Sequence, residues 1–249
     1  MADLPFTFTN PAIASRLARL VDCDGKIPRA IADLGEIAGR DVVVLRTDGR
    51  LRAAQLRALH AHVTASADDG HELPPRCADV VVRYWGESGA LAAPDQAAMT
   101  AAERLLRPGG RLLMVMDYGR DDVARLRPEG ETPEIYRALR ARDARYAAQG
   151  FKLRVIHGWW QFDSLEEASQ FLSEAFGDRG QRVASDMRRP RLSHKVVIYH
   201  RGMAGAAGTA DQARVVATAS RGAAGRGGPQ AGGPASPSSR PVEGTGAAR

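Results

Sequence analysis

The chain has few cysteines, no long apolar run and no metal-ligand motif, and each shortage excludes a class of protein. Its two cysteines, Cys23 and Cys77, lie far apart without a CxxC motif, so we expect reduced, structural thiols. No histidine pair has metal-ligand spacing with a carboxylate, and we expect no metal. No apolar run approaches the ~20 residues of a membrane-spanning helix. The first residues show neither a basic nor an apolar secretion segment, so we expect a cytoplasmic protein without a membrane partner.

The last fifth of the sequence differs from the rest in composition. Residues 203–249 are rich in Ala, Gly, Pro, Ser and Arg and contain no aromatic side chain, which predicts a disordered tail. Of the formal net charge of +6, residues 201–249 carry +4 and residues 1–200 only +2. We therefore do not expect nucleic acid as a partner. The alternative, binding of nucleic acid by the tail, predicts a steep dependence on salt that deletion of the tail would abolish.

Apolar runs and helical patterns alternate along residues 30–200. Expected helices lie at residues 11–20, 29–37, 51–60, 95–106, 133–149 and 164–176, and expected strands at 42–45, 62–65, 79–82, 112–116, 151–156 and 195–199. Strands that alternate with helices at this spacing predict a mostly parallel sheet covered by helices on both faces.

One segment carries a more specific pattern, Glu103-Arg-Leu-Leu-Arg-Pro-Gly-Gly-Arg-Leu-Leu-Met-Val-Met-Asp117. It predicts a helix that ends at Arg107, a turn on Pro108-Gly109-Gly110, and a strand that is buried on both faces. Together with the apolar strand before it, this segment resembles the second half of a class I S-adenosylmethionine (SAM)-dependent methyltransferase. The last strand, helix and strand resemble the C-terminal part of that fold.

The resemblance implies an α/β fold, a three-layer sandwich whose mostly parallel sheet has an antiparallel last strand. It divides the chain into an N-terminal helical cap (1–30), a methyltransferase-like domain (31–202) and the disordered tail (203–249). It also implies SAM as cofactor and a methyl acceptor, which the sequence leaves open between a small molecule and a macromolecule. Nothing in the sequence indicates the oligomeric state.

The loop after the first strand departs from the family pattern. Methyltransferases of this class carry D/E-x-G-x-G-x-G there, whereas this chain reads Val44-Leu-Arg-Thr-Asp-Gly49, with Arg46 at the place of the first glycine. The resemblance implies cofactor contacts from Asp48 and Gly49. The alternative is an ordinary turn between a strand and a helix.

The loop after the second strand offers two acids, Asp68 and Asp69, and two alignments. One of them would accept hydrogen bonds from the cofactor ribose, as the family's acidic residue does. Alternatively, Ala67-Asp-Asp-Gly-His-Glu-Leu-Pro74 resembles the family's next loop, whose aspartate contacts adenine. Both alignments cannot hold, because one strand–helix unit is short or missing before Asp79. A plain solvated loop is the third interpretation.

Two further loops would surround the reacting groups. Tyr84 and Trp85 follow the third expected strand and suit an apolar wall, and Asp117 and Tyr118 follow the fourth, where they could orient a substrate or accept a proton. Core packing is the alternative for Trp85, and loop solubility is the alternative for Asp117 and Tyr118. The later pair Trp159-Trp160 could line the same cleft or pack in the core. The functional hypothesis is methyl transfer from SAM. The alternative is a degenerate, non-catalytic relative that binds a partner or ligand through the old cleft.

Overall fold

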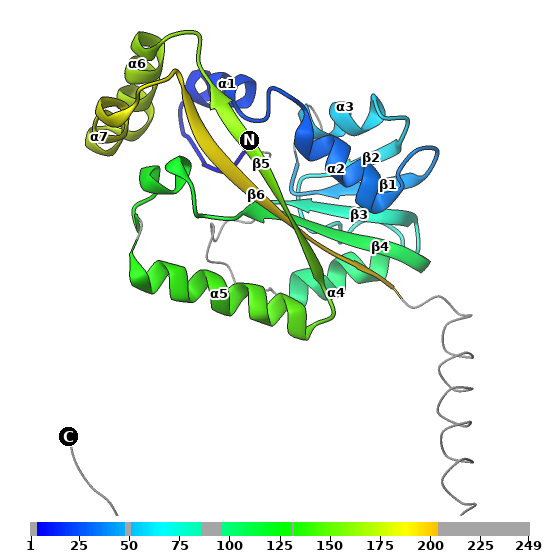
Figure 1. The fold of residues 1–249 in the computed structure, drawn as a ribbon. Coiled ribbons are helices and arrows are strands. Elements are labelled where there is room, and N and C mark those ends of the chain that lie inside the picture. The colour runs from blue at the N-terminus through cyan, green and yellow to red at the C-terminus, as the bar shows by residue number, and fades with distance from the viewer. Residues whose placement is uncertain (1–3, 48–50, 86–95, 131, 204–249) are drawn as a thin grey trace, which may run out of the picture. The chain divides into compact units, whose positions relative to one another are not determined.

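The computed structural model describes residues 4–47, 51–85, 96–130 and 132–203, and its centre is a six-stranded sheet (Figure 1). The strands are β1 (Asp41–Leu45), β2 (His62–Ser66), β3 (Ala78–Tyr84), β4 (Leu106–Asp117), β5 (Lys152–Gln161) and β6 (Arg191–Gly202). Their order across the sheet is β2-β1-β3-β4-β6-β5. β1 pairs in parallel with β2 and β3, and β3 with β4, whereas β6 is antiparallel to both β4 and β5.

Helices cover both faces of this sheet. They are α1 (Pro11–Leu20), α2 (Lys26–Gly35), α3 (Leu51–Arg57), α4 (Gln96–Leu105), α5 (Pro133–Ala148), α6 (Leu165–Phe176), α7 (Asp178–Asp186) and the 3-10 helix η2 (Asp122–Leu126). Side chains alternate along a strand, so Val42 and Val44 pack under α2 and α3, and Val43 packs against α4. Figure 1 shows α2 and α3 on one side of the sheet and α4 and α5 on the other.

This architecture confirms the expected three-layer α/β sandwich with an antiparallel last strand. The described residues also lack the strand–helix unit that the sequence indicated as short or missing before Asp79. Residues 67–77, between β2 and β3, contain neither a helix nor a strand, so one strand–helix unit of the full methyltransferase pattern is absent. Arg104 of α4 ties this loop down, because its guanidinium donates to the carbonyls of Gly70 and Leu73 at 2.8 Å.

The Pro-Gly-Gly segment lies inside a strand rather than between a helix and a strand. α4 ends at Leu105, and Leu106 already pairs with Ala78 of β3. The next pair along the ladder joins Arg111 to Val80, so the residues between form a bulge. A Cβ at Gly110 would lie 2.9 Å from two backbone carbonyl oxygens, which explains a glycine there.

A separate apolar cluster lies beyond one end of the sheet. It joins α1, α6 and α7 to the last residues of β5, a strand that runs past its expected end at residue 156 to Gln161. Trp160 is fully buried in this cluster, which confirms the core interpretation for that residue. The sequence patterns missed α7 and η2. The expected domain boundary at residue 30 falls inside α2, and the expected tail, residues 203–249, lies outside the described residues except for Met203.

Candidate functional site

The carboxyl ends of β1, β2, β3 and β4 meet at one edge of the sheet. In open α/β sheets ligands bind beyond this edge, near the point where the strand order reverses. Since β6 is antiparallel to β4, the amino end of β6 lies at the same edge. Two predicted cofactor residues, Asp48 and Gly49, follow β1 in the sequence and lie outside the described residues.

A cluster of three charges occupies the ends of β1 and β3. The guanidinium of Arg46 donates to both carboxylate oxygens of Asp69, at 3.2 and 3.0 Å, and Arg83 Nε donates to the same carboxylate at 3.0 Å. Burial raises the pKa of Asp69, but the two arginines outweigh it and hold that pKa below its ordinary value. Arg46 itself has a left-handed backbone, with φ of 60°, a conformation that glycine adopts most easily.

Asp68 lies beside this cluster but stays exposed. Its Oδ1 accepts from Ser66 Oγ at 2.7 Å and from the backbone N–H of Gly70 at 2.6 Å, and these bonds lower its pKa. The backbone N–H of Arg46 donates to the Asp68 carbonyl, which ties the loop after β1 to the loop after β2. The structure thus presents one ionised, solvent-facing carboxylate (Asp68) and one neutralised carboxylate (Asp69) at this position.

A buried network begins at the end of β3. Trp85 Nε1 donates to Asp117 Oδ1 at 2.9 Å, and His194 Nε2 lies 3.1 Å from the same oxygen. Trp160 Nε1 lies 3.3 Å from His194 Nδ1, and because an indole only donates, the network assigns the histidine proton to Nε2. Burial lowers the pKa of His194 to about 4, so its imidazole is neutral near pH 7.

Arg127 closes this network from the loop after β4. It forms an ion pair with the other oxygen of Asp117, donates to the Pro5 carbonyl at 3.0 Å, and lies 4.5 Å from the Phe6 ring centre. Burial lowers the pKa of Arg127 to about 10. The carboxylate of Asp117, 4% exposed, therefore joins the sheet edge to the N-terminal segment.

Buried charges that sequence reasoning missed surround the same place. Arg52 on α3 is fully buried, with its guanidinium 5.4 and 5.8 Å from the ring centres of Trp85 and Tyr84. Asp22 is 6% exposed and accepts from the first backbone N–H groups of α2. The available signal was weak: Arg52 stands on the apolar side of a short helix, beside Ala53.

The structure gathers three of the four residues predicted around the reacting groups. Tyr84, Trp85 and Asp117 lie together on the α2 and α3 side, with the first two rings 5.6 Å apart. Tyr118 points to the opposite face, where it packs against the α4 and α5 core and accepts from Arg120 at 3.0 Å.

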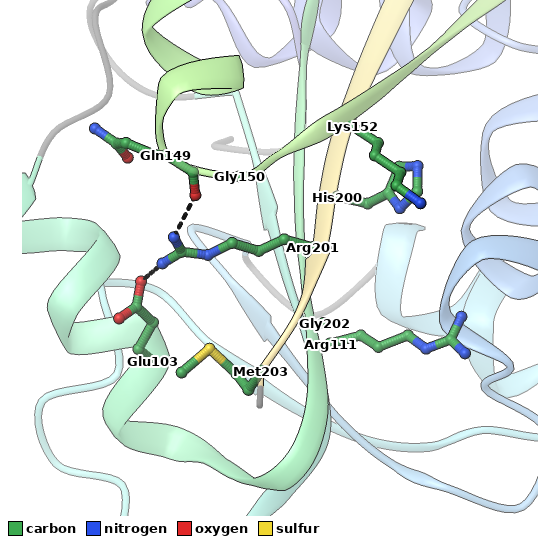
Figure 2. A pocket seen from close by; sticks show the side chains of 9 residues that line it. All are labelled: Glu103, Arg111, Gln149, Gly150, Lys152, His200, Arg201, Gly202 and Met203. Carbon is green, nitrogen blue, oxygen red and sulfur yellow. Dashed lines mark hydrogen bonds and ion pairs between the residues drawn. The ribbon is translucent and has the colours of Figure 1, made fainter. Parts of the chain in front are cut away.

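A pocket of about 620 Å³ lies at the other edge of the sheet and is not part of this site. Figure 2 shows Arg201 reaching Glu103 and the Gln149 carbonyl on one side of β6, with Lys152, His200 and Arg111 on the other. Among the described residues, no three His, Cys, Asp or Glu side chains gather as a metal site. The described helices are all too short or too polar to span a bilayer.

The strand order identifies the fold. The sheet is mostly parallel, and its last strand, β6, lies antiparallel between β4 and β5. This is the arrangement that the sequence resemblance implied. The chain has the class I methyltransferase fold. No family model and no curated protein matches it.

Several solved structures are similar to this chain at low sequence identity. A protein described as a methyltransferase of an antibiotic biosynthesis pathway in Anabaena variabilis is 10% identical over 73% of this chain and 98% of its own, with a TM-score of 0.46. One described as a type II methyltransferase from Anaeromyxobacter dehalogenans is 16% identical over 72% and 97%, with a TM-score of 0.42. YcgJ from Bacillus subtilis is 11% identical over 71% and 97%, with a TM-score of 0.41.

Proposed function

We propose that the protein is a SAM-dependent methyltransferase. The observation that supports this most directly is Asp68, an ionised and exposed carboxylate beyond β2, tied by backbone hydrogen bonds to the loop after β1. A ribose diol offers two donors, and a carboxylate is the group that accepts from both. We therefore assign the ribose contact to Asp68 rather than Asp69, whose oxygens are taken by Arg46 and Arg83.

The backbone at Arg46 also fits the cofactor. A left-handed residue directly after β1 gives the loop the turn that a glycine gives in the family pattern, and the arginine side chain folds onto Asp69. Asp48 and Gly49 complete the proposed contacts. When bound, SAM supplies an electrophilic methyl group on a sulfonium, and the protein has to position the acceptor in line with it and exclude water.

Tyr84 and Trp85 are the residues that we propose beside the reacting groups. Both are buried at the carboxyl end of β3, and Asp117 fixes the Trp85 ring through the indole N–H. We propose Asp117 as a positioning residue rather than a base, because its carboxylate already holds Trp85, His194 and Arg127. Tyr118 faces the other side of the sheet and is left out of the proposal.

Calorimetric titration with SAM and S-adenosylhomocysteine tests the assignment. We expect micromolar binding by the full chain and a loss of about tenfold or more in Asp68→Asn, which keeps shape and removes charge. Asp33→Asn, an exposed acid in the last turn of α2 and therefore near the amino end of β1, is the matched control and should bind as the parent does. Equal binding by the Asp68 variant and the parent would contradict the ribose assignment.

A second function is favoured by the Arg46–Asp69–Arg83 cluster itself. Arg46 stands where the family pattern places a glycine, and together with Arg83 it neutralises Asp69, an arrangement that the cleft of a non-catalytic relative that binds a partner would tolerate. Absence of binding at millimolar SAM and S-adenosylhomocysteine would support this second function over methyl transfer.

A further inference from the structure

A pocket of about 310 Å³ lies at the amino end of β6, apart from the network around Asp117. Its walls come from η2, α7 and the end of β5, and its lining includes Arg125, Trp159, Arg188, Arg189 and Arg191. Because β6 is antiparallel to β4, this pocket is on the same edge of the sheet as the carboxyl ends of the parallel strands. Figure 1 shows α6 and α7 beyond the tip of β5 at that edge.

Positive charge is concentrated on α7 and the segment that leads from it into β6. Residues 178–191 contain five arginines and two aspartates, a net charge of +3, whereas residues 1–200 as a whole carry +2. The remainder of those 200 residues is therefore net −1. A basic stretch on an otherwise nearly neutral domain raises the local concentration of anions.

Three of the four arginines in the pocket keep their donors for a ligand. Arg125 pairs with Asp186, but within the described ranges Arg188, Arg189 and Arg191 form no ion pair. Arg191 lies over Trp159, with its guanidinium carbon 4.3 Å from the ring centre, and a guanidinium stacked on an aromatic face can still donate from its N–H groups. The other acid in the lining, Asp122, is already bonded to the Ser193 hydroxyl and backbone N–H.

Two other pockets among the described residues, both larger in volume, differ in this respect. At the pocket in Figure 2, Arg201 pairs with Glu103 and Arg111 pairs with Glu36. At a third pocket, of about 570 Å³ beside α2, Arg154 pairs with Asp33. The three arginines named at these two pockets thus have acidic partners, whereas Arg188, Arg189 and Arg191 have none among the described residues.

The backbone that carries these arginines is fixed. The Pro190 carbonyl accepts from the Phe162 backbone N–H at 2.9 Å and from Gln161 Nε2 at 3.2 Å, which anchors the loop to the end of β5. α7 packs so closely on α6 that a Cβ at Gly180 would overlap the Leu172 carbonyl. An anchored backbone keeps the bases of the three arginine side chains close together, which lowers the cost of bringing their guanidinium groups to one anion.

We propose that the α7–β6 pocket binds the phosphate group of a ligand. Guanidinium groups match phosphate with pairs of parallel hydrogen bonds, and Arg188, Arg189 and Arg191 supply such pairs from one fixed loop. The phosphate comes either from a small phosphorylated molecule or from the backbone of a single-stranded nucleic acid. Binding of phosphate does not depend on methyl transfer, but if the proposed function holds, the acceptor carries a phosphate.

Titration of the full chain with phenyl phosphate, and separately with a single-stranded oligothymidylate, tests this site and its source. Arg188→Ala/Arg189→Ala should weaken binding about tenfold or more, because it removes two charged donors from the pocket. Arg179→Ala/Arg182→Ala removes the same charge from α7 outside the pocket and should change binding by less than about twofold. Arg188→Lys/Arg189→Lys keeps the charge but loses the paired donors, and we expect an intermediate loss.

Each outcome decides between the alternatives. Loss of phenyl phosphate binding in the pocket variant alone supports a small phosphorylated ligand. Loss confined to the oligonucleotide, again in the pocket variant alone, supports a nucleic acid. Equal weakening in both double alanine variants would mean diffuse attraction by net charge and overturn the pocket, as would failure of both probes to bind the parent. SAM binding, measured on the same samples, reports on the proposed function independently.

Discussion

Replacing Asp117 by alanine should destabilise the protein more than any surface substitution. The side chain is 4% exposed, forms an ion pair with Arg127, and accepts hydrogen bonds from Trp85 and His194. Asp117→Ala leaves the Arg127 guanidinium, itself only 13% exposed, without its counter-charge, and leaves two buried N–H donors unpaired.

The cost follows from the partners left behind. Breaking a buried ion pair by removing one member costs about 3–5 kcal/mol, because the other charge stays buried. In a domain of this size each kcal/mol lowers the melting temperature by about 2–4 °C, so we expect a decrease of roughly 6–20 °C. Denaturant unfolding, followed by the fluorescence of the three tryptophans and by circular dichroism, measures the free energy directly.

A double-mutant cycle separates the pair from its surroundings. Asp117→Ala/Arg127→Ala removes both charges, so its cost should fall short of the sum of the two single variants by about 1 kcal/mol or more. Asp117→Asn keeps an acceptor for Trp85 and should lie between the parent and the alanine variant. A cost below about 1 kcal/mol for Asp117→Ala would refute the reasoning, since that is the range of ordinary surface changes.

Two further changes test neighbouring parts of the argument. The folded pKa of His194, about 4, lies below its ordinary 6.5, so the stability from neutral His194 is complete above pH 6.5 and is lost as the pH falls toward 4. The 2.5-unit difference corresponds to about 3 kcal/mol, and stability against pH should be flatter over this window in His194→Gln than in the parent; parallel curves would contradict it. Arg46 has a φ of 60°, which favours glycine. In denaturant unfolding, the free energy of unfolding of Arg46→Gly should exceed that of Arg46→Ala by about 1 kcal/mol, the reverse of the usual order of these two residues. A less stable glycine variant would mean that the left-handed backbone is not strained.

The order of strands and helices could be predicted because it depends on local patterns. Asn10 and Ser164 stand at the starts of two expected helices and cap them, with side-chain oxygens accepting from the backbone N–H groups of Ala12 and Glu167. The same local patterns could not place the start of β4 at Leu106. That boundary depends on pairing with Ala78 of β3, which is 28 residues away and leaves no trace in the local sequence.

The candidate site was less predictable, because it is built from side chains that converge from distant segments. Trp85 and Asp117 are identifiable as residues that follow strands, but His194 is 77 residues from Asp117 and looks like an ordinary residue of β6. Arg127 stands in a loop whose polarity predicts only solubility. Buried polar groups of this kind become visible when their partners do, since each is tolerated only as part of a satisfied network.

Arg46 explains how the loop after β1 departs from the family pattern without losing its shape. A left-handed conformation costs an L-residue about 1–2 kcal/mol, and a charge-assisted hydrogen bond contributes roughly 1.5–3 kcal/mol. The pair of bonds to Asp69 is therefore large enough to offset the strain, provided that Asp69 is held, and Arg83 holds it from β3. Arg46 thus occupies the Asp69 carboxylate with a structural ion pair. A ligand at this edge meets Asp68 instead, which is why one acid of the pair is neutralised while its neighbour stays exposed and ionised.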